Sequence, residues 1–160
     1  TDLNARTSLQ EARRALQQLR ATPLEDLGLE LAIKTLAEQA AQQASLVLNL
    51  QLPTDNLQYI ETQTEQGVYR IAQEAITNVV RHAEAKQLSI QLSTNNEVLS
   101  LQIEDDGVGF SPKNETKSGH FGYVGMQERA MVIGGTLNLV SEQGKGTKLT
   151  LAVPLVSGVG

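Results

Sequence analysis

Four polar side chains fall on one side of a predicted helix, and together they could bind a metal-bound phosphate chain. The segment RIAQEAITNVVRHAEA places Glu74, Asn78, Arg81 and His82 at steps of four, three and one residues. At about 100° per residue, these positions share one side of an α-helix. Asn is a poor helix former, so Asn78 in the middle of a helix asks for a reason. A solvated helix surface is the competing explanation, and this helix alone leaves both open.

An aspartate followed by two spaced glycines stands directly after a predicted strand. The motif is Asp105-x-Gly107-x-Gly109. A carboxylate in this place can accept a hydrogen bond from an exocyclic amine such as that of adenine. The glycines let the chain turn sharply and let a flat ring approach the backbone. An ordinary Asp/Gly turn after a strand is the alternative.

Two more glycine-containing segments could contact a phosphate. Gly119, Gly122 and Gly125 lead into a predicted helix, whose first N–H groups attract anions. A loop with a helix cap would look the same. The segment 144–147, GKGT, does not fit GxxxxGK[ST] and leads into a strand, so it indicates a hairpin turn in which Thr147 could contact a phosphate.

Composition excludes several other classes of protein. The chain has 160 residues, 40% hydrophobic and only 3% aromatic, which suits one domain plus an extra element and a core of Leu, Ile, Val and Ala. The absence of cysteine excludes disulfides and cysteine-bound zinc. A net charge of −5 argues against nucleic-acid binding. No apolar run approaches the roughly 20 residues that cross a bilayer.

The elements that must position these groups follow from hydrophobic periodicity. We expect helices at residues 1–21, 24–44, 68–85 and 123–133, and strands at 46–52, 86–94, 98–104, 136–141 and 147–154. Thr62 and Glu65 have the spacing of a capping box, which would start the central helix near these residues. Leu31 is among the inward candidates of the second helix. Residues 111–121 are polar and turn-rich and are predicted to be mobile. This order predicts an α+β fold, a two-layer α/β sandwich with a mixed, mostly antiparallel sheet preceded by an N-terminal helix.

The order of these signals is more specific than any one of them. It resembles the ATP-binding domain (the Bergerat-type fold) of the gyrase, Hsp90, histidine-kinase and MutL superfamily. The local sequence most resembles that of two-component sensor histidine kinases, in the subgroup that signals to nitrate-response/LuxR-type regulators. The segments similar to their catalytic domain are QEAITNVVRHAEA, IEDDGVGF, GHFGYVGMQERA and GGTLNLVSEQGKGTKLTLAVPL. LQEARRALQQLRATPLEDLGLELAIKTLAEQA is similar to the segment that precedes this domain.

The resemblance implies a role for each candidate residue. Asn78 matches a Mg²⁺ ligand and Glu74 the acidic position implicated in catalysis, while Arg81 and His82 match the basic end of the same motif, facing the phosphates. The remaining matches are the adenine-reading Asp105 with Gly107 and Gly109, the glycine box of Gly119, Gly122 and Gly125, and Thr147 in the pocket wall. Residues 111–121 would be the lid over ATP.

One departure from the family pattern shapes the expected function. The phosphoacceptor histidine of the family lies upstream in a motif resembling ERxRIARELHD, which is absent here. We therefore expect residues 1–22 to be the tail of the dimerisation and phosphotransfer helices, residues 23–156 the ATP-binding catalytic domain, and 157–160 a tail. Such a fragment would bind ATP and Mg²⁺ but could not phosphorylate itself.

The implied partners are the histidine-containing dimerisation domain of the same protein and the receiver domain of a response regulator. The full-length protein would be a homodimer. The fragment itself would be cytoplasmic, without contact to nucleic acid or membrane, although full-length relatives are often membrane-anchored. Two alternatives remain: an ATPase or serine kinase of the same superfamily, and a non-catalytic nucleotide-sensing or interaction module of the same fold.

Overall fold

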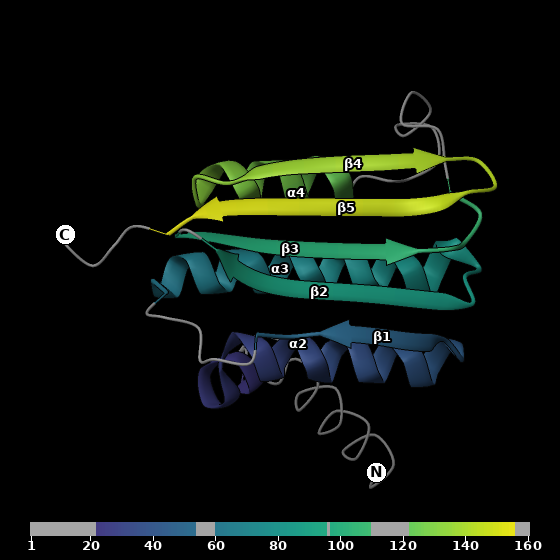
Figure 1. The fold of residues 1–160 in the computed structure, drawn as a ribbon, viewed down its shortest axis with the longest axis horizontal. Coiled ribbons are helices and arrows are strands. Elements are labelled where there is room, and N and C mark those ends of the chain that lie inside the picture. Colours follow the sequence, from purple (N-terminus) through teal and green to yellow (C-terminus); the bar gives the residue numbers. More distant parts are fainter. Residues whose placement is uncertain (1–21, 54–59, 96, 110–121, 156–160) are drawn as a thin grey trace, which may run out of the picture.

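The computed structural model describes residues 22–53, 60–95, 97–109 and 122–155 (Figure 1). The predicted first helix, the predicted lid and Gly119 lie outside these ranges. The described elements, in chain order, are α2 (Thr22–Ala44), β1 (Val47–Gln51), α3 (Thr62–Asn78), the π-helix η1 (Val79–Ala83), β2 (Gln87–Asn95), β3 (Val98–Asp105), α4 (Gly122–Val132), β4 (Thr136–Glu142) and β5 (Gly146–Pro154).

The strands form one sheet in the order β1-β2-β3-β5-β4. Only the β1–β2 pair is parallel, and the other three pairs are antiparallel. The helices lie on one face of this sheet (Figure 1). The predicted two-layer sandwich with a mixed, mostly antiparallel sheet is therefore confirmed.

The core lies between the helices and the sheet, and it is aliphatic as the composition predicts. Every second residue of β3 is buried, because alternate side chains of a strand point to the same face. Helix α3 buries Val68, Ala72, Ala75 and Ile76 on one side, as a period of 3.6 residues requires. The largest fully buried side chains are Leu29, Ile33, Ile71, Leu88, Ile90, Leu92, Leu99, Leu101, Leu151, Val68 and Val153.

Helix α2 differs from its prediction in two respects. Gly28 has φ 82° and ψ 170°, so the helix is kinked there. Leu31, predicted to face inward, is 45% exposed, whereas Leu29 and Ile33 are buried. The alanines at 32, 37 and 40 are also buried. The buried face therefore includes small side chains that allow close packing. The positions of the leucines alone did not predict which side of the helix is buried.

Helix α3 begins near the expected residue, but its N-cap and its C-terminal end differ from the prediction. Glu61 is the N-cap residue and no side chain caps the helix, so the capping box of Thr62 and Glu65 is wrong. Thr62 is already inside the helix, where its side chain cannot serve as the N-cap. At the other end the α-helix does not continue to residue 85. It widens into η1, and Glu84 then closes the turn in the left-handed conformation (φ 50°, ψ 39°).

Among the described helices, none combines the length and the apolarity that a membrane crossing requires.

Candidate functional site

Three polar side chains form a row across the sheet where β3 ends and β5 begins. Asp105 of β3 pairs with Thr147 of β5, and Thr147 pairs with Ser141 of β4. Two residues further into the sheet, the matching row is apolar and consists of Ile103, Leu149 and Leu139. Because alternate residues share a face, both rows point towards the helices. The polar row therefore borders one end of the hydrophobic core.

Asp105 is the only acidic or basic side chain among the described residues that is buried, with 7% of its surface exposed. The N–H of Gly107 donates to its Oδ1 atom at 2.8 Å. Burial raises the pKa of the Asp105 carboxyl above its usual value, and the N–H groups of Gly107 and Thr147 oppose this only in part. A buried carboxylate needs hydrogen-bond donors, so a ligand amine would suit this position.

The hydroxyl groups of Thr147 and Ser141 are joined in the same row. Their Oγ1 and Oγ atoms lie 2.8 Å apart, and Ser141 also donates to the carbonyl oxygen of Gly146 at 3.2 Å. Thr147 was predicted from the sequence, but Ser141 was missed. The alternation of β4 would have placed Ser141 on the inner face, yet only the strand register shows that it meets Thr147.

Close backbone contacts join the Asp105–Gly109 loop to the β4–β5 turn. Gly109 has φ +62°, and a Cβ atom there would overlap the carbonyl oxygen of Glu142. Gly146 has φ +82°, and a Cβ atom there would overlap the carbonyl oxygen of Asp105. Both positions therefore require glycine for backbone conformation and for space. Sequence reasoning included Gly109 in the site but treated Gly146 as an ordinary turn residue.

The neighbouring Asp106 has a different role. Its Oδ1 atom accepts hydrogen bonds from the backbone N–H groups of Lys86 and Gln87, at 2.8 and 2.9 Å. These two bonds lower the pKa of the Asp106 carboxyl. Asp106 is exposed and was not identified from the sequence, because its partners lie about twenty residues earlier in the chain.

The polar stripe of α3 reaches the same end of the sheet. Glu74 and Asn78 are half-buried on the last turns of α3, and Arg81 and His82 are exposed on η1. The chain then enters β2, whose Leu88 pairs with Asp105. Figure 1 shows α3 running along β3 on the helical face. Asp105 points to the same face, because it is buried in phase with Leu101 and Ile103. The stripe and the polar row are thus on the same side of the sheet and at the same end.

The glycine box is only partly described. Gly122 is the first residue of α4. A Cβ atom on Gly125 would meet no atom within 4 Å beyond its chain neighbours and the nearby backbone of its own helix. Gly125 is therefore not required by packing within the described part of the chain.

The acidic and imidazole side chains do not by themselves form a metal cage. Within the described ranges, no group of three or more His, Asp or Glu residues could hold a metal ion. Mg²⁺ is commonly bound by one or two protein oxygens together with water and substrate phosphates. The amide oxygen of Asn78 fits that pattern, because the remaining ligands would come from a nucleotide and from water.

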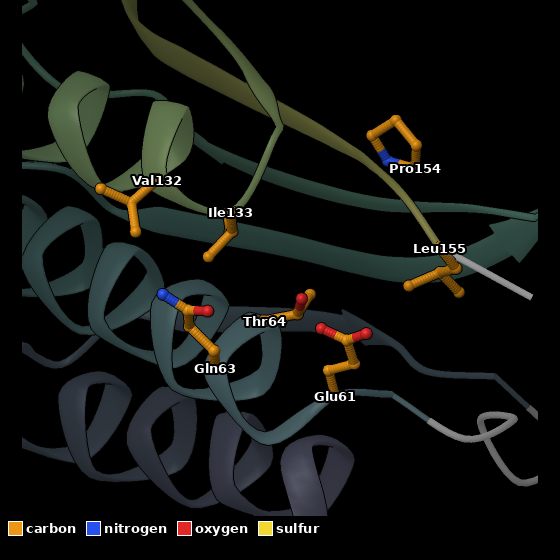
Figure 2. Close-up of a pocket in the computed structure, with 7 residues that line it drawn as sticks. All are labelled: Glu61, Gln63, Thr64, Val132, Ile133, Pro154 and Leu155. Atoms are coloured by element: carbon orange, nitrogen blue, oxygen red, sulfur yellow. The ribbon is translucent and has the colours of Figure 1, made fainter. Parts of the chain in front are cut away.

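A pocket of about 110 Å³ lies at the opposite end of the sheet (Figure 2). Pro154 lines it and pairs with Val98, the first residue of β3, whereas Asp105 is the last. None of the predicted site residues lines this pocket. Its lining consists of Glu61, Gln63, Thr64, Val132, Ile133, Pro154 and Leu155.

Comparisons with known proteins agree with the resemblance inferred from the motifs. Residues 63–157 match the family described as histidine kinase-, DNA gyrase B-, and HSP90-like ATPase. The oxygen sensor histidine kinase NreB of Staphylococcus carnosus is 31% identical over 147 residues, which are 92% of this chain and 42% of that protein. The chain thus spans less than half the length of this curated relative.

Solved structures share the fold. A histidine kinase domain from a blue-light activated histidine kinase of Erythrobacter litoralis has a TM-score of 0.66 at 20% identity, over 79% of this chain and 61% of that one. Full-length ShkA in complex with AMPPNP has a TM-score of 0.65 at 18% identity, over 83% and 30%. With more than half of its residues matched by the family, the chain belongs to the histidine kinase-, DNA gyrase B- and HSP90-like ATPases.

Proposed function

We propose that this chain is the ATP-binding catalytic domain of a sensor histidine kinase. It would transfer the γ-phosphoryl group of ATP to a histidine in a helical dimerisation domain, for relay to a response regulator. The observation that supports this best is the polar row of Asp105 and Thr147, which lies at the same end and on the same side of the sheet as the last turn of α3. Asn78 is the last residue of that helix. ATPase family membership and the similarity to NreB favour ATP as the ligand.

Asp105 would recognise the base. Its buried carboxylate can accept a hydrogen bond from the exocyclic amine of adenine, and desolvation makes such a bond stronger than it would be in water. Gly107 holds the carboxylate in place through its N–H group. Gly109 and Thr147 would form the adjoining wall. The buried surroundings would keep water from competing for the amine.

The stripe on α3 and η1 would bind the phosphate end. Asn78 would contribute its amide oxygen to Mg²⁺, and Arg81 and His82 would lie near the phosphates together with the glycine box of Gly119, Gly122 and Gly125. Mg²⁺, when bound, would neutralise charge on the transferring phosphoryl group. Glu74, one turn before Asn78, would orient the attacking imidazole or act as a base.

Calorimetry of ATP binding with and without Mg²⁺ tests the site. Asp105→Asn should weaken ATP binding by about tenfold or more, because hydrogen bonds to a charged group contribute roughly 1.5–3 kcal/mol. Asn78→Ala should mainly reduce the gain in affinity that Mg²⁺ provides, because it removes the amide oxygen that would bind the ion. Glu104→Gln is the control, because it removes an exposed acid next to Asp105 on the outer face of β3. Wild-type affinity in both site variants would refute the assignment.

Phosphotransfer requires a separate experiment. We expect no acid-labile label on this chain when it is incubated alone with γ-labelled ATP, and slow labelling of a supplied histidine-containing dimerisation domain. Tethering of the two domains in a full-length homodimer would raise the rate through effective concentration. The reaction would take place in the cytoplasm. ATP binding without transfer to any such domain would favour a non-catalytic nucleotide-sensing module.

A further inference from the structure

We propose that Asp106 is a positioning residue that couples the base end of the site to its phosphate end. This inference rests on the proposed function, because it concerns how the two halves of that site are held together. The base end is the Asp105–Gly109 loop, and the phosphate end is the last turn of α3 with η1. Asp106 lies in the Asp105–Gly109 loop and accepts hydrogen bonds from Lys86 and Gln87, which follow η1 in the chain.

The connection consists of two hydrogen bonds to one oxygen atom. The backbone N–H groups of Lys86 and Gln87 both donate to Oδ1 of Asp106, at 2.8 and 2.9 Å. Bonds from neutral donors to a carboxylate are stronger than bonds between neutral groups. The sequence separations are 20 and 19 residues, so these contacts join segments that local structure does not bring together.

The peptide held by Asp106 is also fixed on its other side. The carbonyl oxygen of Lys86 accepts a hydrogen bond from the N–H of Val47, the first residue of β1, at 2.8 Å. Lys86 therefore links the edge strand to the loop that follows β3. Glu84 lies two residues earlier and closes η1 in the left-handed conformation. Only Ala85 separates Glu84 from Lys86, so a movement of η1 would also move the peptide that Asp106 holds.

Asp105 and Asp106 are adjacent in the chain but have different roles. Asp105 is buried and points towards the helices, where a ligand could meet it. Asp106 is exposed, and its charge meets backbone N–H groups of the chain itself. Since its hydrogen bonds lower the pKa of its carboxyl, Asp106 stays ionised at neutral pH. It would act by positioning η1 and would not touch the nucleotide.

A comparison of two ligands tests this role. Adenosine reports on the base end alone, whereas ATP with Mg²⁺ reports on both ends. NMR titration gives both dissociation constants. The dissociation constant of adenosine divided by that of ATP with Mg²⁺ measures the gain in affinity from the phosphate end. We expect Asp106→Ala to reduce that ratio about fivefold, within the range by which residues between two sites change their coupling. Adenosine affinity should change less than twofold.

Two further variants separate positioning from general destabilisation. Asp106→Asn keeps an acceptor oxygen but not the charge, so we expect a ratio between those of Asp106→Ala and the wild type. Glu104→Gln, which removes a neighbouring exposed negative charge, should leave the ratio unchanged. Equal weakening of both ligands, or no change in either, would overturn the inference. Absence of ATP binding by the wild type would instead refute the proposed function.

Discussion

The strictest test of the site geometry is a pair of glycine substitutions, one in the β4–β5 turn and one at the first residue of β5. Gly146 and Gly144 both have φ +82°, so alanine at either position would adopt the same unfavourable backbone conformation. At Gly144 a Cβ atom would meet nothing within 4 Å. At Gly146 it would overlap the carbonyl oxygen of Asp105 and lie 3.1 Å from the Cα atom of Asp106. The two variants therefore differ in one physical respect, the contact with the Asp105 loop.

The size of the difference follows from two contributions. Left-handed backbone in a residue with a Cβ atom costs about 1–2 kcal/mol, and this applies to both variants. Forcing an extra methyl group into a packed site costs roughly another 1–3 kcal/mol, and this applies only to Gly146→Ala. We therefore expect Gly144→Ala to lose about 1–2 kcal/mol of unfolding free energy and Gly146→Ala about 2–5 kcal/mol.

Urea unfolding at neutral pH, followed by circular dichroism, measures both values. Thermal melts should agree, at about 2–4 °C per kcal/mol for a chain near this size. ATP affinity provides the second comparison, because displacement of the Asp105 loop should weaken binding in Gly146→Ala more than in Gly144→Ala. Equal losses of stability in the two variants would refute the close approach of Gly146 to Asp105.

Substitutions at Asp105, Ser141 and Gly67 test the polar row and the packing of the helices. Burial raises the pKa of the Asp105 carboxyl above 3.8, so the folded chain binds a proton at Asp105 more tightly than the unfolded chain does. The unfolding free energy of the wild type should therefore fall as the pH rises just above 3.8. Asp105→Asn should lack this fall and be at least as stable at pH 7 in urea unfolding; a less stable variant would contradict the reasoning. Ser141→Ala should lose about 1 kcal/mol with its 2.8 Å bond to Thr147, and Ser141→Thr should lose less. Gly67→Ala places a Cβ atom 2.8 Å from Cγ2 of Ile133, so it should destabilise despite its better helix propensity. In a double-mutant cycle with Ile133→Ala, the double variant should lose less unfolding free energy than the two single variants lose in sum. Additive losses would argue against the contact.

The sequence allowed much of the fold to be predicted, because hydrophobic periodicity is a local property. The arc of Val68, Ala72 and Ile76 on α3 follows from a period of 3.6 residues. The inward direction of Asp105 follows from a period of two, in phase with Leu101 and Ile103. The family could be recognised for a related reason, since its motifs are short segments in a fixed order.

The features that sequence reasoning missed depend on contacts between distant segments. Asp106 holds a peptide about twenty residues earlier in the chain, and nothing near it in sequence indicates that partner. Gly146 needs its small size because β5 pairs with β3 next to Asp105. The π-helix after Asn78 contains no glycine or proline that would have marked the change of helix type.

The two adjacent aspartates provide a physical argument for our proposal that Asp105 recognises a ligand. The pKa of Asp106 is lowered by its hydrogen bonds, so its ionised form stabilises the fold at neutral pH and this contribution would be lost as pH falls below about 3.8. The pKa of Asp105 is raised by burial, so its ionised form opposes folding at neutral pH. A hydrophobic side chain would fill the position of Asp105 without that penalty, as Ile103 and Leu101 do in the same strand. A ligand that donates a hydrogen bond to the carboxylate would reverse the penalty only when bound, and recognition of such a ligand is the physical reason we assign to an acid at this position.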